Sequence, residues 1–317
     1  MAKSEDFHLL YKKSLMFCIT CSENRYSNDN VFLISKDAER LIKFCGICGF
    51  GITCKSLVKS SGFRRFNVAL EFLLKCFRLG RSITMFTRHS FKTKLKILDY
   101  GCGRGEFLYF MNRLGWTAVG TEYSLESSYE ALDKGIPIFF GEHAQKDLYE
   151  HYGNAYFDVI TSYHNLEHLD DPRDFLSLSW DLLKKRGMLL LEVPNIESLQ
   201  YLISKEDWLL LDIENHKFHF SRKSLEALLV KHGFYILKQS TFSMNYGLIG
   251  MIEAMKSRIT RIRDKSRQSK IQTPGETKLL KSSLVTILFL LVPSLVLELL
   301  SVFMKRGAVI RIHAIKI

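Results

Sequence analysis

The sequence predicts an α/β fold with a mostly parallel sheet, a small cysteine-rich module before it and a helical, hydrophobic insertion before its last strand. Three features predict this fold: a glycine-rich turn at residues 97–105, two Cys-x-x-Cys pairs near the N-terminus and an apolar run at 284–304. A chain of 317 residues can form one large domain or two smaller ones. With 25% charged and 47% hydrophobic residues, global disorder is excluded.

The glycine-rich turn reads Ile-Leu-Asp-Tyr-Gly-Cys-Gly-Arg-Gly, an apolar strand followed by glycines at alternate positions. Glycine allows positive φ and a close approach of the backbone to a ligand. A helix is predicted from Glu106 to Leu114. A second strand, 117–121, then ends at Glu122, whose carboxylate can accept both hydroxyls of a ribose. Strand, glycine turn and helix in this order are typical of a nucleotide-binding α/β unit.

The details of the turn distinguish between nucleosides. Dinucleotide sites use Gly-x-Gly-x-x-Gly and place a pyrophosphate at the helix N-terminus. Here the spacing is Gly-x-Gly-x-Gly, and Glu106 in the first helical turn would repel phosphate. Asp99 just before the turn suits a cationic ligand. S-adenosylmethionine (SAM) has an ammonium, a sulfonium and no phosphate, so these residues favour SAM over NAD.

The segment from about 95 to 240 resembles class I SAM-dependent methyltransferases of types 11, 12 and 23. Five blocks in the right order carry the resemblance: ILDYGCGRGEFL (97–108), VGTEYS (119–124), FDVITSYHNLEHLDDPRDFL (157–176), GMLLLEVPN (187–195) and HKFHFSRKSLEALLVKHGF (216–234). The resemblance implies a Rossmann-like seven-stranded sheet whose last strand is antiparallel. The remaining strands are expected at 136–140, 157–161, 188–193, 235–239 and 307–314, and a helix at 221–232 is expected to be capped by Ser221.

The resemblance also implies which residues bind SAM. They follow the carboxyl ends of the strands, where α/β sheets place their ligands. The methionine end of SAM is expected to contact Asp99, Gly101, Gly103 and Gly105, and the ribose is expected to contact Glu122. The adenine is expected to lie near Tyr123, Glu142 and His143, and Ser162 is expected to contribute from the segment after the fourth strand.

Four further residues are candidates for catalysis. His164 and His168 are four apart, with Glu167 between them, and would share one face of a helical turn. This group could supply a general base, or it could only bond loop backbone. It could also pass for a metal pair, although no third ligand is evident in the sequence. His216 lies in a loop that we expect to face the substrate.

Four cysteines near the N-terminus are spaced like metal ligands. Cys18 and Cys21 form one Cys-x-x-Cys pair, and Cys45 and Cys48 form another after 23 intervening residues. Two such pairs bridged by a hairpin predict a zinc ribbon within residues 1–58. With four protein ligands, the Zn²⁺ would be structural. The alternative is four buried or redox-inert cysteines.

Charge is unevenly distributed along the chain. The net charge is +12, yet residues 97–255 carry more acids than bases. The segment 55–96 has eleven Lys and Arg with one acid, and residues 59–96 are expected to form a basic helical linker or cap. Residues 256–281 are also strongly basic. This segregation predicts an anionic partner, either a membrane surface or a nucleic acid.

The insertion at 244–306 combines a basic amphipathic helix, predicted at 246–263, with the apolar run 284–304. Pro293 and Glu298 predict that this run forms two shorter helices. A single membrane span is disfavoured because the final strand, within 307–317, must return to the same sheet. We therefore expect the run to lie in one leaflet or to cover the core.

These features predict a SAM-dependent methyltransferase whose core occupies 97–243. The expected acceptor is a hydroxyl on a saccharide or lipid-linked intermediate at the inner face of a membrane. No export signal opens the chain, so we expect a cytoplasmic location. The alternatives are an RNA methyltransferase and a non-catalytic SAM-binding protein; the sequence does not indicate an oligomeric state.

Overall fold

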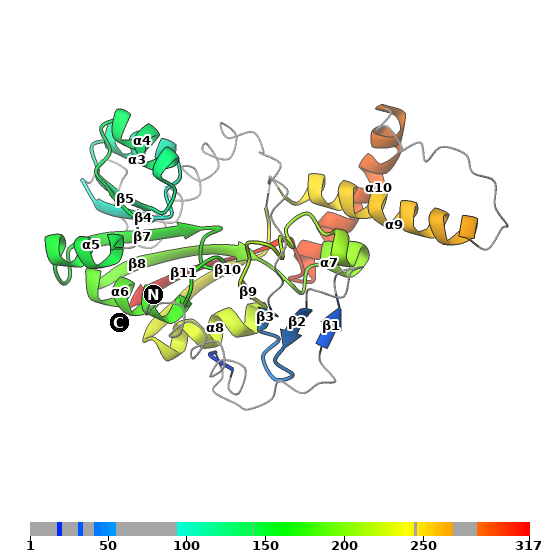
Figure 1. Ribbon diagram of the computed structural model, residues 1–317, viewed down its shortest axis with the longest axis horizontal. Coiled ribbons are helices and arrows are strands. Elements are labelled where there is room, and N and C mark those ends of the chain that lie inside the picture. The colour runs from blue at the N-terminus through cyan, green and yellow to red at the C-terminus, as the bar shows by residue number, and fades with distance from the viewer. Residues whose placement is uncertain are drawn as a thin grey trace, which may run out of the picture.

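The computed structural model describes residues 18–20, 31–33, 41–54, 94–141, 143–243, 246–268 and 284–317. Within these residues the chain forms a seven-stranded sheet, a smaller four-stranded sheet and a pair of long helices at one end of the molecule (Figure 1). The predicted basic helix at 59–96 lies outside the described residues except for its last three.

The seven-stranded sheet has the order β10-β11-β8-β7-β4-β5-β6. Neighbouring strands from β6 to β8 pair in parallel, whereas β11 pairs antiparallel with both β8 and β10. The predicted antiparallel last strand is therefore confirmed. The strands are β4 (Lys96–Tyr100), β5 (Thr117–Glu122), β6 (Ile138–Phe140), β7 (Phe157–Tyr163), β8 (Leu183–Pro194), β10 (Phe234–Ser240) and β11 (Val309–Lys316).

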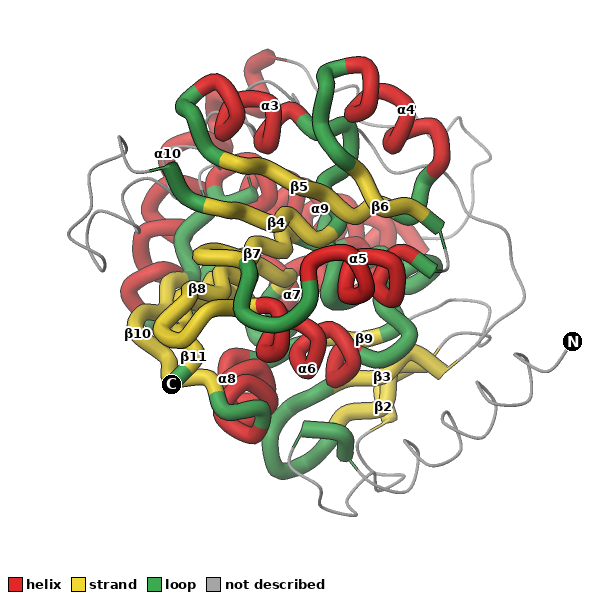
Figure 2. The backbone as a smooth tube through the Cα atoms, turned by 90° about the vertical axis from the view of Figure 1, so that its left-hand side faces the viewer, coloured by secondary structure: helices red, strands yellow, loops and turns green. Residues whose placement is uncertain are grey.

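Helices cover both faces of this sheet because alternate strand residues are apolar on each face. Figure 2 shows α3 and α4 on one side and α5, α6 and α8 on the other. Leu98 and Ile160 pack with one helix layer, while Ile97 and Val159 pack against the other. The helices are α3 (Glu106–Arg113), α4 (Leu125–Asp133), α5 (Ala144–Tyr152), α6 (Pro172–Leu182), α7 (Leu199–Ser204), the 3-10 turn η2 (Lys205–Asp207) and α8 (Arg222–Lys231).

Local sequence signals set several helix ends. Ser221 caps α8 as predicted: its side chain accepts from the Ser224 N–H, and the Ser224 side chain bonds back to the Ser221 backbone. Gly115 follows α3 with a φ of +85°, a conformation that glycine adopts without a side-chain clash.

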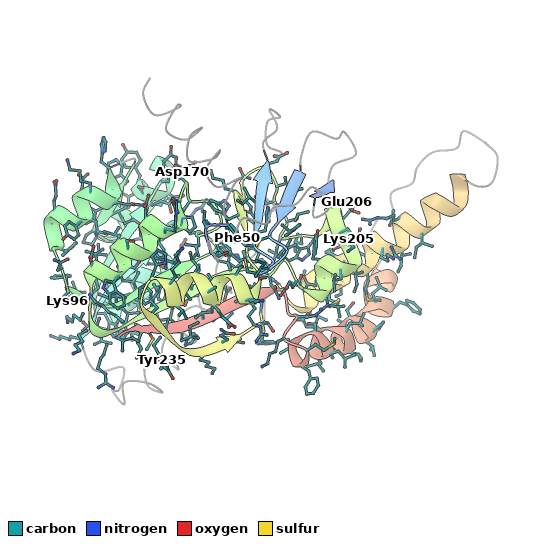
Figure 3. The ribbon with its side chains drawn as sticks, turned by 90° about the horizontal axis from the view of Figure 1, so that it is seen from below. Phe50, Lys96, Asp170, Lys205, Glu206 and Tyr235 are labelled. Atoms are coloured by element: carbon teal, nitrogen blue, oxygen red, sulfur yellow. The ribbon has the colours of Figure 1, made fainter. Side chains whose placement is uncertain are left out.

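The four-stranded sheet joins the cysteine-containing segment to the core. Its order is β1 (Val31–Leu33), β2 (Leu41–Phe44), β3 (Gly51–Cys54) and β9 (Phe218–His219), and β9 comes from the chain segment between β8 and β10. Phe50 stacks on Phe218 with 5.6 Å between ring centroids and lies between these strands and the core (Figure 3). The Ser221 hydroxyl also donates to the Cys48 carbonyl at 2.5 Å. This segment is thus packed directly on the core.

The insertion forms two helices, α9 (Leu248–Gln268) and α10 (Leu284–Phe303), which contact each other. The prediction of two short helices at 284–304 is wrong, because α10 is one helix with Pro293 inside it. A proline removes one backbone hydrogen bond and bends a helix without having to end it. Glu298 does not interrupt α10 either, since its side chain is buried beside Gln200 and Ser301.

Among the described residues, none of the helices combines the length and apolar character that crossing a bilayer requires.

Candidate active site

The glycine turn between β4 and α3 has left-handed backbone at Gly101, Gly103 and Gly105, with φ of +78°, +56° and +70°. A Cβ at Gly101 would lie 2.6 Å from the Asn165 side chain, and one at Gly105 would lie 2.8 Å from Ala131. At Gly103 a Cβ would meet nothing within 4 Å. Two glycines are therefore required by packing, while the third presents bare backbone to open space, as close contact with a nucleoside needs.

Glu122 at the end of β5 is held by this turn. Its Oε2 accepts the Gly103 N–H at 2.7 Å, and its Oε1 accepts the N–H groups of Tyr123 and Ser124 at 2.8 and 2.9 Å. An ionised carboxylate offers about four acceptor positions. In this arrangement about one position remains for a ribose hydroxyl, fewer than the two that the sequence suggested.

The other predicted cofactor residues surround the turn. Asp99 is buried and accepts a hydrogen bond from the Thr161 hydroxyl at 2.6 Å. The Ser162 hydroxyl is buried, with no hydrogen-bond partner among the described residues. Tyr123 is 79% exposed, so its ring is available to cover a flat base. His143 is exposed at the start of α5, and Glu142 lies outside the described residues.

The positions and chemistry of these groups fit SAM. The bare backbone at Gly103 admits a nucleoside, Glu122 retains acceptor capacity for the ribose, and a buried carboxylate (Asp99) and hydroxyl (Ser162) lie nearby on β4 and β7. When bound, SAM supplies an electrophilic methyl group on a sulfonium.

His164 follows β7 with a φ of +51° and lies between two carboxylates. Its Nε2 is 3.2 Å from Glu192 Oε1, and its Nδ1 is 3.6 Å from Glu167 Oε1. Burial by itself lowers the pKa of His164, but the attraction of these two carboxylates outweighs burial and raises the pKa to about 9. His164 is therefore protonated near neutral pH and is poorly suited to accept a proton from an acceptor.

Glu192 and Arg311 complete this network and were not predicted from the sequence. Arg311 Nε on β11 donates to Glu192 Oε2 on β8 at 2.5 Å, and both side chains are buried. The two residues are directly opposite in the β8–β11 register. A lone acid within an apolar strand is a signal for such a pair, but its partner becomes evident only when the register is known.

The structure brings Glu167, His168 and His216 together, although His216 is 48 residues further along the chain than His168. Potential ligand atoms of these three side chains lie within 4.8 Å of one another. His216 Nε2 is 4.0 Å from Glu167 Oε1, and the rings of His168 and His216 have centroids 4.6 Å apart. The sequence suggested His164 and His168 as a possible metal pair, whereas the structure groups His168 with Glu167 and His216 and leaves His164 out of this cluster.

The protonation states of this group are set by burial and by mutual charge. Burial lowers the pKa of His216 to about 3, which keeps the imidazole neutral. Burial alone raises the pKa of Glu167, but the surrounding histidines, led by His164, bring it below its ordinary value. A neutral imidazole and an ionised carboxylate are forms that bind cations.

The cluster is adjacent to the glycine turn on one side and to the N-terminal segment on the other. Asn165, two residues before Glu167, packs on Gly101. From β3, the Thr53 hydroxyl donates to the His216 carbonyl at 2.8 Å and lies 2.7 Å from His219 Nε2. Neither Thr53 nor His219 was among the predicted site residues, because their proximity depends on the pairing of β3 with β9.

Three of the four predicted zinc ligands converge. Cys18, Cys45 and Cys48 are buried, with sulfur atoms within 4.8 Å of one another and a Cys18–Cys48 distance of 3.6 Å. Tetrahedral zinc with bonds of about 2.3 Å separates its sulfur ligands by about 3.8 Å, so the spacing fits. The Cys18 thiol and burial raise the pKa of the Cys48 thiol. Cys21 lies outside the described residues.

Comparisons with known proteins match the central part of this chain. The profile of the family described as "Methyltransferase domain" matches residues 71–239, slightly more than half of the chain. A protein named ubiquinone biosynthesis O-methyltransferase from Shewanella sp. (strain ANA-3) is 28% identical over 160 residues, covering 48% of this chain and 67% of that protein. Its namesake from Escherichia coli O7:K1 is 30% identical over 115 residues, covering 34% of this chain and 47% of that protein. This chain thus spans two thirds of the first relative's length and about half of the second's.

Solved structures are similar at a lower level. A SAM-dependent methyltransferase from Archaeoglobus fulgidus has a TM-score of 0.46 and 20% identity, covering 79% of this chain and all of that one. Another from Mesorhizobium loti has a TM-score of 0.46 and 16% identity, covering 76% and 97%. At TM-scores below 0.5 these likenesses decide nothing about ligand or substrate.

Proposed function

From the premise that this chain belongs to the methyltransferase-domain family and is a class I SAM-dependent methyltransferase, we propose that it methylates a hydroxyl of a lipid-linked acceptor at the inner face of a membrane. O-methylation is supported by the printed names of the curated relatives. The membrane location is supported above all by helix α10, whose polar side chains are buried and whose apolar side chains are exposed.

The candidate active site contains what transfer to a hydroxyl requires. The acceptor oxygen must be aligned with the methyl group and must lose its proton. Glu167, His168 and His216 lie near the glycine turn, because Asn165, two residues before Glu167, contacts Gly101. Protonated His164 does not serve as the base; held by Glu192, it positions Glu167. The cluster Glu167–His168–His216 therefore receives the acceptor oxygen in this proposal.

Helix α10 buries its polar side and exposes its apolar side. Ser294, Glu298 and Ser301, spaced by four and three residues, are at most 4% exposed and face the protein. Apolar side chains spaced by three and four residues form an exposed stripe: Phe289, Val292, Val296, Leu299 and Phe303. We refer to these five residues as the apolar stripe of α10. A helix of this kind is stable in water only if something covers the stripe.

The residues beside the apolar stripe support a lipid bilayer as the partner that covers it. Lys305 and Arg306 are exposed directly after α10, where they can reach anionic headgroups while Phe303 enters the apolar layer. No acid is exposed on α10 among its described side chains. In Figure 3 α10 lies at the end of the molecule far from Lys96, with side chains projecting outward. A lipid-linked acceptor would be presented at the same surface.

Co-sedimentation with anionic vesicles tests this proposal. Leu299 on the stripe and Val230 on α8 are each 62% exposed, so Leu299→Glu and Val230→Glu are a matched pair. We expect Leu299→Glu to lower vesicle partitioning at least about tenfold and Val230→Glu to leave it unchanged. Equal partitioning of both variants would contradict a membrane role for α10. Methyl transfer to a saccharide hydroxyl in solution, with no vesicle dependence, would instead favour an acceptor without a lipid.

We also propose that Cys18, Cys45 and Cys48 bind a structural Zn²⁺, with Cys21 as the fourth ligand. The sulfur spacing supports it, as does the packing of this segment on Phe218 and Ser221. Mass spectrometry of the native protein should find one zinc per chain that Cys48→Ser removes. Wild-type protein that is free of zinc after growth in zinc-containing medium would contradict this assignment.

A further inference from the structure

We propose that Glu167, His168 and His216 form a second metal site, which binds a divalent transition-metal ion and, through it, the acceptor oxygen. The role in methyl transfer rests on the proposed function, whereas metal binding itself does not. Of the metal pair that the sequence suggested, His164 and His168, only His168 belongs to this site, and the fold places Glu167 and His216 beside it.

The two segments that carry these ligands are fastened together by backbone hydrogen bonds. The N–H groups of Lys217 and Phe218 both donate to the Glu167 carbonyl, at 2.8 and 3.2 Å. The ligand atoms consequently lie within 4.8 Å of one another before any ion is bound. Bonds of about 2.0–2.2 Å allow two ligand atoms of one ion to be at most about 4.4 Å apart, so the three atoms need only small shifts to reach a common ion. Such preorganisation is expected of a binding site and is not needed to hydrogen-bond a loop.

His168 has the hydrogen bond that commonly orients a metal-binding histidine. Its Nδ1 donates to the backbone carbonyl of Asn215 at 3.1 Å. This bond fixes the tautomer and leaves the lone pair of Nε2 available for a ligand. The donor and acceptor belong to the same two segments as the metal ligands, so the bond also fixes the ring between them.

Glu167 is a buried carboxylate with unused acceptor capacity. Its side chain is 1% exposed, and neither oxygen has a hydrogen-bond partner among the described residues. The nearest histidine nitrogens are 3.6 Å away on His164 and 4.0 Å away on His216, beyond a normal hydrogen bond. His164 has a closer anionic partner in Glu192 at 3.2 Å. Glu167 can therefore turn to an ion without leaving His164 uncompensated.

Two imidazoles and one carboxylate can bind divalent transition-metal ions such as Zn²⁺, Mn²⁺, Fe²⁺ or Co²⁺ and leave coordination positions open. An acceptor hydroxyl at an open position becomes more acidic and releases its proton to water. An oxygen electron pair then forms the O–CH₃ bond as the C–S bond breaks, and that bond's electron pair stays on sulfur. The ion keeps its oxidation state throughout, so no oxidant or reductant is required.

The test is a titration of the full chain with Mn²⁺. Binding is measured by the decrease of the electron paramagnetic resonance signal of the free ion. Mn²⁺ prefers nitrogen and oxygen ligands to thiolates, which separates this site from the cysteine site. We expect one Mn²⁺ per wild-type chain and affinity at least about tenfold weaker in His168→Gln and in Glu167→Gln. His151→Gln, on the exposed surface of α5, is the matched control and should bind like wild type.

SAM calorimetry on the same samples separates the two claims. Variants that still bind SAM are folded, so a weakened Mn²⁺ affinity in them supports the metal site. Absence of Mn²⁺, Zn²⁺ and Co²⁺ binding by SAM-competent wild type, or equal affinity in His168→Gln, would overturn the inference and leave the methyltransferase function standing. Metal binding by a wild type that does not bind SAM would uphold this inference and count against the proposed function.

Discussion

In the proposed active site, the cofactor end is built mainly from backbone, whereas the acceptor end is built from side chains. The glycine turn and Glu122 lie within residues 99–122 and meet through N–H groups. The acceptor end draws Glu167 and His216 from separate loops and Arg311 from the last strand. We therefore expect substitutions at the cofactor end to weaken SAM binding and substitutions at the acceptor end to lower the rate of methyl transfer.

The largest expected effect is on turnover. Glu167→Ala removes the carboxylate shared by three histidines, and we expect kcat to fall at least about 1,000-fold, equivalent to about 4 kcal/mol in the barrier. SAM affinity should stay within about twofold, since Glu167 does not contact the glycine turn in any described interaction. Single-turnover kinetics with labelled SAM, alongside SAM calorimetry, measures both. A parallel loss of SAM affinity would erase the distinction between the two ends.

The next effect is on stability. Arg311→Met leaves Glu192 buried without its guanidinium partner, and we expect the free energy of unfolding to fall by about 3–5 kcal/mol in urea denaturation. The double variant Arg311→Met/Glu192→Gln removes the charge as well and should recover part of the loss. No recovery in the double variant would show that the damage came from packing and not from an unpaired charge.

Gly101→Ala tests the backbone character of the cofactor end. The new Cβ would lie 2.6 Å from Asn165 in a left-handed conformation, so we expect about 2–3 kcal/mol of destabilisation and weaker SAM binding. Gly115→Ala is the matched control, because it has a φ of +85° but nothing within 4 Å. It should cost only about 1–2 kcal/mol and spare SAM affinity. Equal behaviour of the two variants would show that Asn165 does not constrain the turn.

The smallest effect concerns α10. Burial raises the pKa of Glu298 to about 7, against opposing hydrogen bonds from Gln200 and Ser301. The folded state therefore holds this proton to higher pH than the unfolded chain, and stability falls as pH rises from about 4.5 to 7. Glu298→Gln should be about 1–3 kcal/mol more stable than wild type at pH 8 and equal to it below pH 4.5.

Urea denaturation at both pH values measures this effect. Glu253→Gln on α9 is the control, since Glu253 is partly exposed and paired with Lys256. It should change stability by less than about 0.5 kcal/mol at either pH. If Glu298→Gln were less stable than wild type at pH 8, the surrounding groups would have to stabilise the ionised carboxylate of Glu298 more than burial destabilises it.

The same comparison explains what the sequence could and could not predict. The core sheet, the cap at Ser221 and the glycine turn depend on contiguous signals, and the structure confirms them. The Glu192–Arg311 pair and the contact of Thr53 with His216 depend on strand register and on β3 joining β9, which local patterns do not encode. The two-helix prediction for 284–304 failed because tertiary packing on α9 outweighs the local preference of Pro293.

The separation of cofactor binding from acceptor binding is best measured by calorimetric titration of SAM into wild type, Glu122→Ala and His168→Gln. We expect at least about 30-fold weaker SAM binding in Glu122→Ala, because the carboxylate that holds the Gly103 backbone is lost. Affinity should stay within about twofold of wild type in His168→Gln. Unchanged SAM affinity in Glu122→Ala, or a loss confined to His168→Gln, would contradict the division of the site into a cofactor end and an acceptor end.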